Sequence, residues 1–173
     1  QQGSSLQWVR GQNDLFAVNN LEHGLPRTEL WDVSGKRVRT HPMHLANVSA
    51  DGRYGVSYCF RRLSRGMPGY GYHKISKCAE TDRISVVNLS SGEARATLNL
   101  RDLAAINPPN TMDRAFHFFS HALFSPDSTR FLFYHRWRRR NGVLRTRLYS
   151  VGINGEDLFS FPDGDYSHLA WRN

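Results

Sequence analysis

Short apolar and aromatic runs, each closed by a turn, recur along the whole of this 173-residue sequence. The runs are about four to eight residues long and are bounded by Gly, Asp, Asn, Ser and Pro, which is typical of β-strands and their connections. No stretch keeps apolar residues at helical spacing over about ten residues, so the sequence predicts an all-β chain. The predicted strands are residues 6–9, 15–19, 28–33, 37–41, 45–48, 54–60, 83–88, 94–99, 122–124, 130–135, 146–151 and 158–161.

Two turn patterns repeat along the chain. In the first, a strand meets a Gly-containing turn and a charged residue opens the next strand, at residues 31–36, 87–93 and 151–156. In the second, an apolar strand meets a tight turn and returns, at residues 48–54 and 124–131. Together they describe a four-stranded meander that recurs about every 40 to 50 residues, which is typical of the blades of a β-propeller.

The expected fold is therefore a β-propeller of four-stranded blades, of which the chain contains about three to three and a half. Two insertions, residues 61–82 and 107–120, extend the second and third blades. Because propellers typically have about four to eight blades, we expect a partial ring that the remaining blades of a longer protein, or a second copy of the chain, complete. The expected blades and the start of the next one cover residues 6–43, 44–106, 107–166 and 167–173.

Arginine supplies most of the positive charge of the chain. The sequence has 23 Lys and Arg against 15 Asp and Glu, a formal net charge of +8, and only three of the basic residues are lysine. Arginine suits bidentate binding of carboxylates and phosphates, so the composition favours an anionic ligand. The one dense basic run, residues 136–140, leads into Asn141 and Gly142, a hairpin-turn signal that argues against a nucleic-acid surface.

Composition also excludes several protein classes. At 39% apolar residues the chain is too hydrophobic for intrinsic disorder, and no apolar run is long enough to span a membrane. Cys59 and Cys78 allow at most one disulfide, which excludes a disulfide framework and a four-cysteine zinc site. No signal peptide is visible at the start of the sequence, so we expect a cytoplasmic protein.

Five short motifs follow one another in the second half of the chain, at residues 121–127, 130–137, 146–149, 154–157 and 167–171. The first reads His-Ala-Leu-Phe-Ser-Pro-Asp and the last reads Ser-His-Leu-Ala-Trp. In this order, across about residues 44–173, the sequence resembles the carboxy-terminal half of bacterial β-propellers of the TolB-like and oligogalacturonate lyase-like group. It is most similar to the uncharacterised members of that group.

This resemblance implies a seven-bladed propeller that cleaves short pectin-derived uronides by β-elimination at a divalent metal, usually manganese. Three positions match histidines that hold the metal in that family: His121, His135 and His168. This chain has Arg136 and Leu169 where the family has glutamate. The difference favours the alternative of a non-catalytic propeller that acts as a scaffold for protein–protein interaction.

Histidines also occupy corresponding positions in successive predicted blades. His44, His121 and His168 each precede the first strand of a blade, and that innermost strand lines the channel of a propeller. The imidazoles are then expected to converge, and with a carboxylate or water they suit a divalent cation. The alternative is that each histidine caps its strand by hydrogen bonding to the backbone.

The sequence thus predicts a site for an anionic oligosaccharide at the channel mouth. In β-elimination a base removes the proton beside a uronate carboxyl group, and a metal or an arginine stabilises the negative charge that develops. We expect catalytic roles for His121 and Arg136, and binding of a ligand carboxylate by Arg62. Tyr70 and Tyr72, in a Gly-rich loop, either stack on a sugar ring or pack over the face of the propeller.

Overall fold

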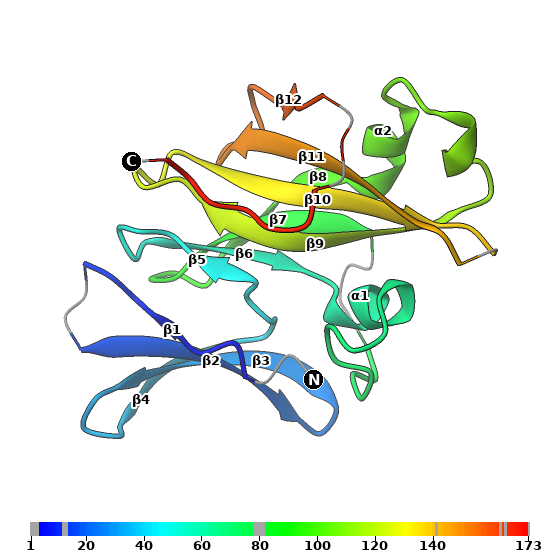
Figure 1. Cartoon of the computed structure of the whole chain (residues 1–173). Helices are drawn as coiled ribbons and strands as arrows, with labels where there is room; N and C mark the ends of the chain where they lie inside the picture. Colours follow the sequence, from blue (N-terminus) through cyan, green and yellow to red (C-terminus); the bar gives the residue numbers. More distant parts are fainter. Residues whose placement is uncertain are drawn as a thin grey trace.

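The computed structural model describes residues 4–11, 14–77, 82–140, 142–162, 164 and 166–172. Within these residues the chain forms three four-stranded antiparallel sheets, each an open meander of consecutive strands (Figure 1), so the prediction of an all-β chain is confirmed. The first sheet contains β1 (Gln7–Trp8), β2 (Leu15–Glu22), β3 (Leu25–Asp32) and β4 (Arg37–His41). The second contains β5 (Asn47–Val48), β6 (Tyr54–Tyr58), β7 (Arg83–Asn88) and β8 (Ala94–Asn99). The third contains β9 (Phe116–Phe124), β10 (Arg130–Arg138), β11 (Leu144–Gly152) and β12 (Phe159–Ser160).

Short helices interrupt this pattern where the sequence predicts strand or loop. The helix α1 follows β6 directly, so the strand predicted over residues 54–60 ends at Tyr58. Cys59 caps α1, because its sulfur accepts a hydrogen bond from N of Arg62, and Asn99 caps α2 in the same way. Helices this short contain too few residues to show an amphipathic period. The helices are α1 (Phe60–Gly66), α2 (Leu100–Ala105) and the 3-10 helix η1 (Asn110–Met112).

The two repeated turn patterns form similar structures wherever they occur. In the β5–β6 turn the Ser49 hydroxyl donates to Oδ1 of Asp51 at 2.6 Å, and in the β9–β10 turn Ser125 donates to Asp127 at 2.5 Å. The other pattern forms the β3–β4, β7–β8 and β11–β12 hairpins, each of which contains a glycine with positive φ, a conformation that strains other residues. These glycines are Gly35, Gly92 and Gly155.

The first strands of the three sheets lie beside one another, with β5 in contact with both β1 and β9. The side chain of Gln7 in β1 accepts a hydrogen bond from N of Val48 in β5 at 2.9 Å. One sheet further on, the side chain of Asn47 in β5 accepts a hydrogen bond from N of Phe124 in β9 at 2.8 Å. Each sheet is thus joined to the next through its first strand.

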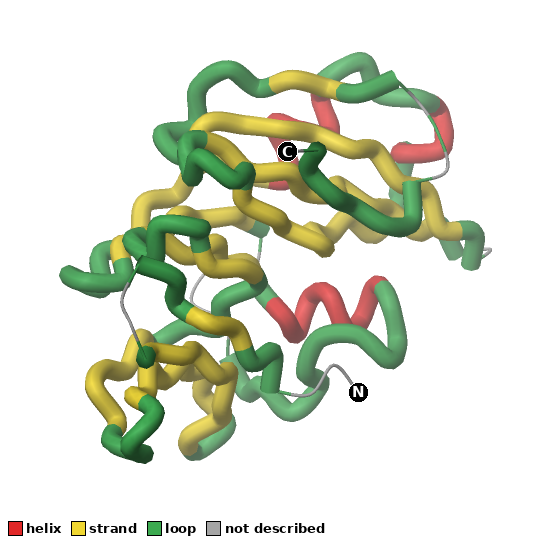
Figure 2. Tube along the Cα trace, turned by 60° about the vertical axis from the view of Figure 1, so that its left-hand side comes forward, coloured by secondary structure: helices red, strands yellow, loops and turns green. Residues whose placement is uncertain are grey.

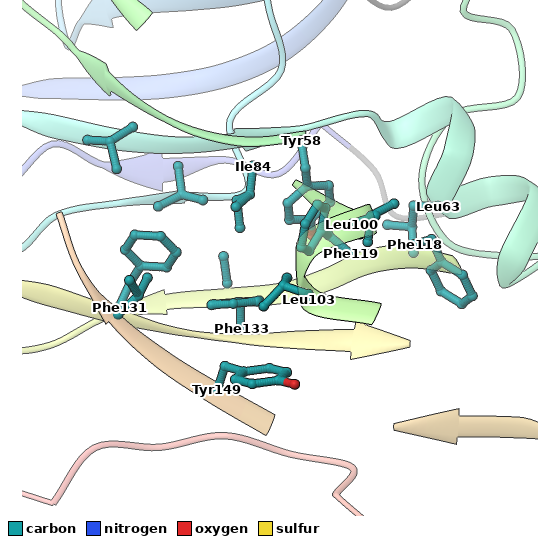
Figure 3. Packing of buried hydrophobic residues seen from close by; sticks show 14 of the residues in the cluster. Tyr58, Leu63, Ile84, Leu100, Leu103, Phe118, Phe119, Phe131, Phe133 and Tyr149 are labelled. Carbon is teal, nitrogen blue, oxygen red and sulfur yellow. The ribbon is translucent and has the colours of Figure 1, made fainter. Parts of the chain in front are cut away.

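The largest hydrophobic core lies between the second and third sheets (Figure 3). Phe131, Phe133 and Tyr149 of the third sheet are fully buried there. Tyr58 and Ile84 of the second sheet belong to the same cluster. Because successive side chains of a strand point to opposite faces, β10 presents its even-numbered residues to the other face of the third sheet.

A C-terminal segment, residues 166–172, covers that other face without forming a strand (Figures 1 and 2). Its Leu169 and Trp171 pack on the buried cluster of Leu132, Tyr134 and Leu148. The Trp171 indole donates a hydrogen bond to the carbonyl of Leu123 at 3.1 Å. This face, with the C-terminal segment on one side and the end of α1 on the other, carries the residues discussed next.

Candidate anion-binding site

A β-bulge in β9 positions His121. The register of β9 against β10 shifts between Leu132 and Tyr134, because β9 has one residue more than β10 at this point. His121 lies in the bulge with a φ of 53°, in the left-handed region that a histidine rarely adopts. Bulges re-aim side chains and are frequent beside functional sites. His121 thus lies inside β9, and the prediction that it precedes the first strand of a blade is wrong.

Aromatic side chains surround the imidazole of His121. Its ring centroid lies 5.2 Å from that of Tyr134 and 5.9 Å from that of Tyr70. The Tyr58 side chain is hydrogen-bonded to the backbone of His121. Among the described residues, Nδ1 of His121 has no hydrogen-bond partner although it is buried. This nitrogen thus lies in an aromatic environment without a polar partner among the described residues.

Burial keeps this imidazole neutral. It lowers the pKa of His121 to about 4, and the positive charges of Arg136 and His168 act in the same direction. At pH 7 this imidazole is therefore neutral, with one ring nitrogen unprotonated. Burial also raises the pKa of Tyr58, so that its phenol stays protonated. The site thus combines neutral ring groups with the cation of Arg136.

The Arg136 side chain extends over the ring of Tyr134, with Cζ 4.7 Å from the ring centroid. Arg136 is only 4% exposed. Its Nη1 donates a hydrogen bond to Sδ of Met67 at 3.0 Å, and its buried Nε has no partner among the described residues. No ion pair with a carboxylate of the described chain neutralises this guanidinium group. Arginine keeps its charge even when burial lowers its pKa, as it does here.

A cavity of about 650 Å³ opens beside this guanidinium group. Arg136, Arg145 and Met67 line it together with Tyr166 and Ser167 of the C-terminal segment. A space of this size is typical of small-molecule sites, which take about 300 to 1,000 Å³. Arg136 therefore borders a space large enough for a small anionic molecule.

The three histidines predicted to hold a metal do not come together. His121 and His168 influence each other electrostatically, and His168 is exposed. His135 lies on the opposite face of β10, fully buried, with Nε2 2.8 Å from Nδ1 of His117. No group of three or more His, Cys, Asp or Glu side chains in the described chain is placed to hold a metal ion. The expected manganese site does not fit these residues.

Two of the predicted ligand-binding residues have structural contacts instead. Nε of Arg62 donates to the carbonyl of His117 at 2.6 Å, which ties α1 to β9. The ring of Tyr72 stacks on Phe60 at 5.2 Å, so this tyrosine follows the packing alternative. Tyr70, at 42% exposure and beside His121, is the predicted ligand-binding residue that lies at the site.

His44 follows the capping alternative. Its Nε2 lies 2.9 Å from the carbonyl oxygen of Asn20, and its ring packs edge-on against Phe60 and Tyr72. His44 is 3% exposed. It joins the first sheet to the second and does not contribute to the site.

Sequence analysis did not identify Tyr58, Tyr134 or Met67 as part of this site. For Tyr134 a signal was present, because it lies two residues before Arg136 in β10 and residues two apart in a strand share a face. Met67 reaches Arg136 from 69 positions earlier in the chain, at the end of the unpredicted helix α1. No local pattern indicates such a contact.

Two general findings complete the description of the chain. No helix in the described residues is long and apolar enough to cross a membrane. Comparison of the sequence with protein-family models and with curated proteins finds no match.

Proposed function

We propose that this chain binds an anionic, uronide-like carbohydrate on the face of the third sheet, with the ligand carboxylate on Arg136. We further propose that the three sheets are successive blades of a partial β-propeller of the TolB-like and oligogalacturonate lyase-like group. Two observations support the fold: each sheet is a four-stranded meander, and the first strands lie side by side as the innermost strands of blades do.

The binding proposal rests on one observation, a buried arginine that lines a cavity without an ion-pair partner in the described chain. A buried charge is costly unless it is paired. A ligand carboxylate offers Arg136 that pairing through a charge-assisted hydrogen bond. Tyr70, partly exposed beside His121, offers an aromatic ring to the sugar.

We further propose β-elimination as the chemistry of the site, because His121 and Arg136 both lie against the ring of Tyr134. With the uronate carboxylate on Arg136, the neutral imidazole of His121 takes the proton from the neighbouring carbon. The electrons of that C–H bond form a carbon–carbon double bond. The glycosidic oxygen leaves the next carbon with its bonding pair and takes a proton from water. Arg136 stabilises the negative charge that develops on the carboxylate, and no step requires a metal.

Calorimetric titration with galacturonate and with galactose tests the binding. We expect wild-type protein to bind galacturonate and not galactose, because the sugars differ in the carboxylate that Arg136 recognises. Arg136→Gln is expected to weaken galacturonate binding about 10- to 100-fold, as loss of a charge-assisted hydrogen bond does. Arg101→Gln, on the exposed surface of α2, is the matched control and keeps wild-type affinity. Equal binding by both variants, or no binding by the wild type, contradicts the proposal.

The elimination step has a separate test. His121→Asn keeps a residue that tolerates the left-handed backbone but removes the imidazole. We expect this variant to bind galacturonate as the wild type does and to produce no unsaturated product from digalacturonate, followed by its ultraviolet absorbance. A variant as active as the wild type would show that the site binds uronides without His121 acting as the base.

A further inference from the structure

The guanidinium group of Arg136 is held by two contacts that carry no charge. Its plane lies over the ring of Tyr134, and Nη1 donates to the thioether sulfur of Met67 at 3.0 Å. Nη1 is the only guanidinium nitrogen of Arg136 with a hydrogen bond to a described residue. Because Nε is buried, Nη2 is the guanidinium nitrogen left for a ligand.

The kind of acceptor at Nη1 decides how much charge remains for that ligand. A thioether sulfur is a weak, neutral acceptor, so it orients the guanidinium group without compensating its charge. A carboxylate at the same place would form an ion pair with Arg136 and neutralise its charge. With a neutral acceptor at Nη1, a ligand carboxylate can form the charge-assisted hydrogen bond with Nη2.

We propose that Met67 is a positioning and specificity residue, which holds Nη1 of Arg136 without neutralising its charge, so that a ligand carboxylate binds at Nη2. The inference rests on the proposed function and adds to it the nitrogen that binds the carboxylate. The helix α1, which lies between β6 and β7, ends at Met67, and Met67 lines the cavity. The proposal thus gives this helix a role in the site.

Met67→Glu and Met67→Gln form a matched pair that isolates charge. The two side chains have the same length and both accept a hydrogen bond from Nη1, but only the glutamate supplies a negative charge. In galacturonate titrations we expect M67Q to stay within about threefold of wild type, and M67E to bind about 10- to 100-fold more weakly. Thermal unfolding confirms that each variant is folded before it is titrated.

A measurement on the wild-type protein keeps the inference testable if either variant fails to fold. The Nε–H resonance of Arg136, assigned in nitrogen-15 NMR spectra by its loss in R136K, is expected to shift as galacturonate is added. A resonance that stays in place while galacturonate binds overturns a direct contact with this guanidinium group, and equal affinity of M67E and M67Q overturns the role of Met67. If either of these results is found but R136Q still binds galacturonate more weakly than wild type, the proposed function stands. If the wild-type protein binds no galacturonate, both the proposed function and the role of Met67 are contradicted.

Discussion

Acid is expected to destabilise this protein through a buried pair of histidines, His117 and His135. Nε2 of His117 lies 3.3 Å from the carbonyl oxygen of Met112, and its Nδ1 lies 2.8 Å from Nε2 of His135. A carbonyl only accepts, so His117 carries its proton on Nε2 and accepts with Nδ1 the Nε2–H of His135. The buried Nδ1 of His135 has no partner among the described residues. Both rings are therefore neutral in the folded protein.

The size of the effect follows from the shift in pKa. Burial lowers the pKa of His135 from 6.5 to about 3, and electrostatic interactions with His117 and Arg147 act in the same direction. Burial also lowers the pKa of His117. The unfolded chain thus takes up protons first, so the contribution to stability is complete above pH 6.5 and is lost as the pH falls toward 3. The slope reaches about 1.4 kcal/mol per pH unit for each histidine. For His135 the full loss is about 3 to 6 kcal/mol, comparable with the stability of a small domain.

Urea unfolding between about pH 8 and pH 4.5 measures this loss. We expect the free energy of unfolding to fall less steeply below pH 6.5 in His135→Phe than in the wild type. Carboxylates titrate in both proteins and cancel in the difference. His73→Gln, which replaces an exposed histidine, is the control and follows the wild type. Equal slopes for H135F and wild type, or a His135 resonance that titrates near pH 6.5, would refute the reasoning.

Three further predictions concern stability and association. In urea unfolding, Gly52→Ala is expected to lower the free energy of unfolding by several kcal/mol more than Gly35→Ala does. Both glycines have positive φ, but a Cβ at Gly52 would lie 2.0 Å from the carbonyl oxygen of Arg10, whereas a Cβ at Gly35 would meet no atom within 4 Å. Cys59 is disulfide-bonded, while Cys78 lies outside the described residues; reduction is expected to remove about 2 to 4 kcal/mol, and an unchanged melting temperature after reduction would contradict this. Trp8 is 59% exposed on the first sheet, so we expect concentration-dependent self-association in size-exclusion chromatography that Trp8→Ser reduces; a monomer at all concentrations would argue against it.

The sequence predicted the strands well because strand length, alternation and turn chemistry are local properties. Each predicted strand overlaps one in the structure, and β4, β7 and β8 have the predicted bounds. The candidate site was harder to predict, because it depends on which face of a strand each residue occupies. His135 and Arg136 are neighbours in β10, so alternation alone puts them on opposite faces and separates two residues that the sequence analysis placed in one site.

Other parts of the site were beyond the reach of local patterns. The bulge at His121 arises because β9 has one residue more than β10 between two paired positions. This mismatch depends on how the two strands pair, which the sequence of β9 alone does not indicate. The length of β9 was underestimated for a related reason: residues 116–120 were assigned to an insertion, although they pair with β10 as regularly as the predicted part does. Tertiary pairing, and not propensity, extends this strand.

The contacts that join one sheet to the next have a consequence for the order of folding. Each hairpin closes a short loop, which costs little entropy, whereas Asn47 and Phe124 are 77 positions apart and meet only when two finished sheets dock. The bond between Met67 and Arg136 likewise spans 69 positions. We therefore expect the cavity beside Arg136 to be assembled in the last step. A ligand held there would stabilise the docked state over earlier states in which the hairpins have formed but the sheets are still apart.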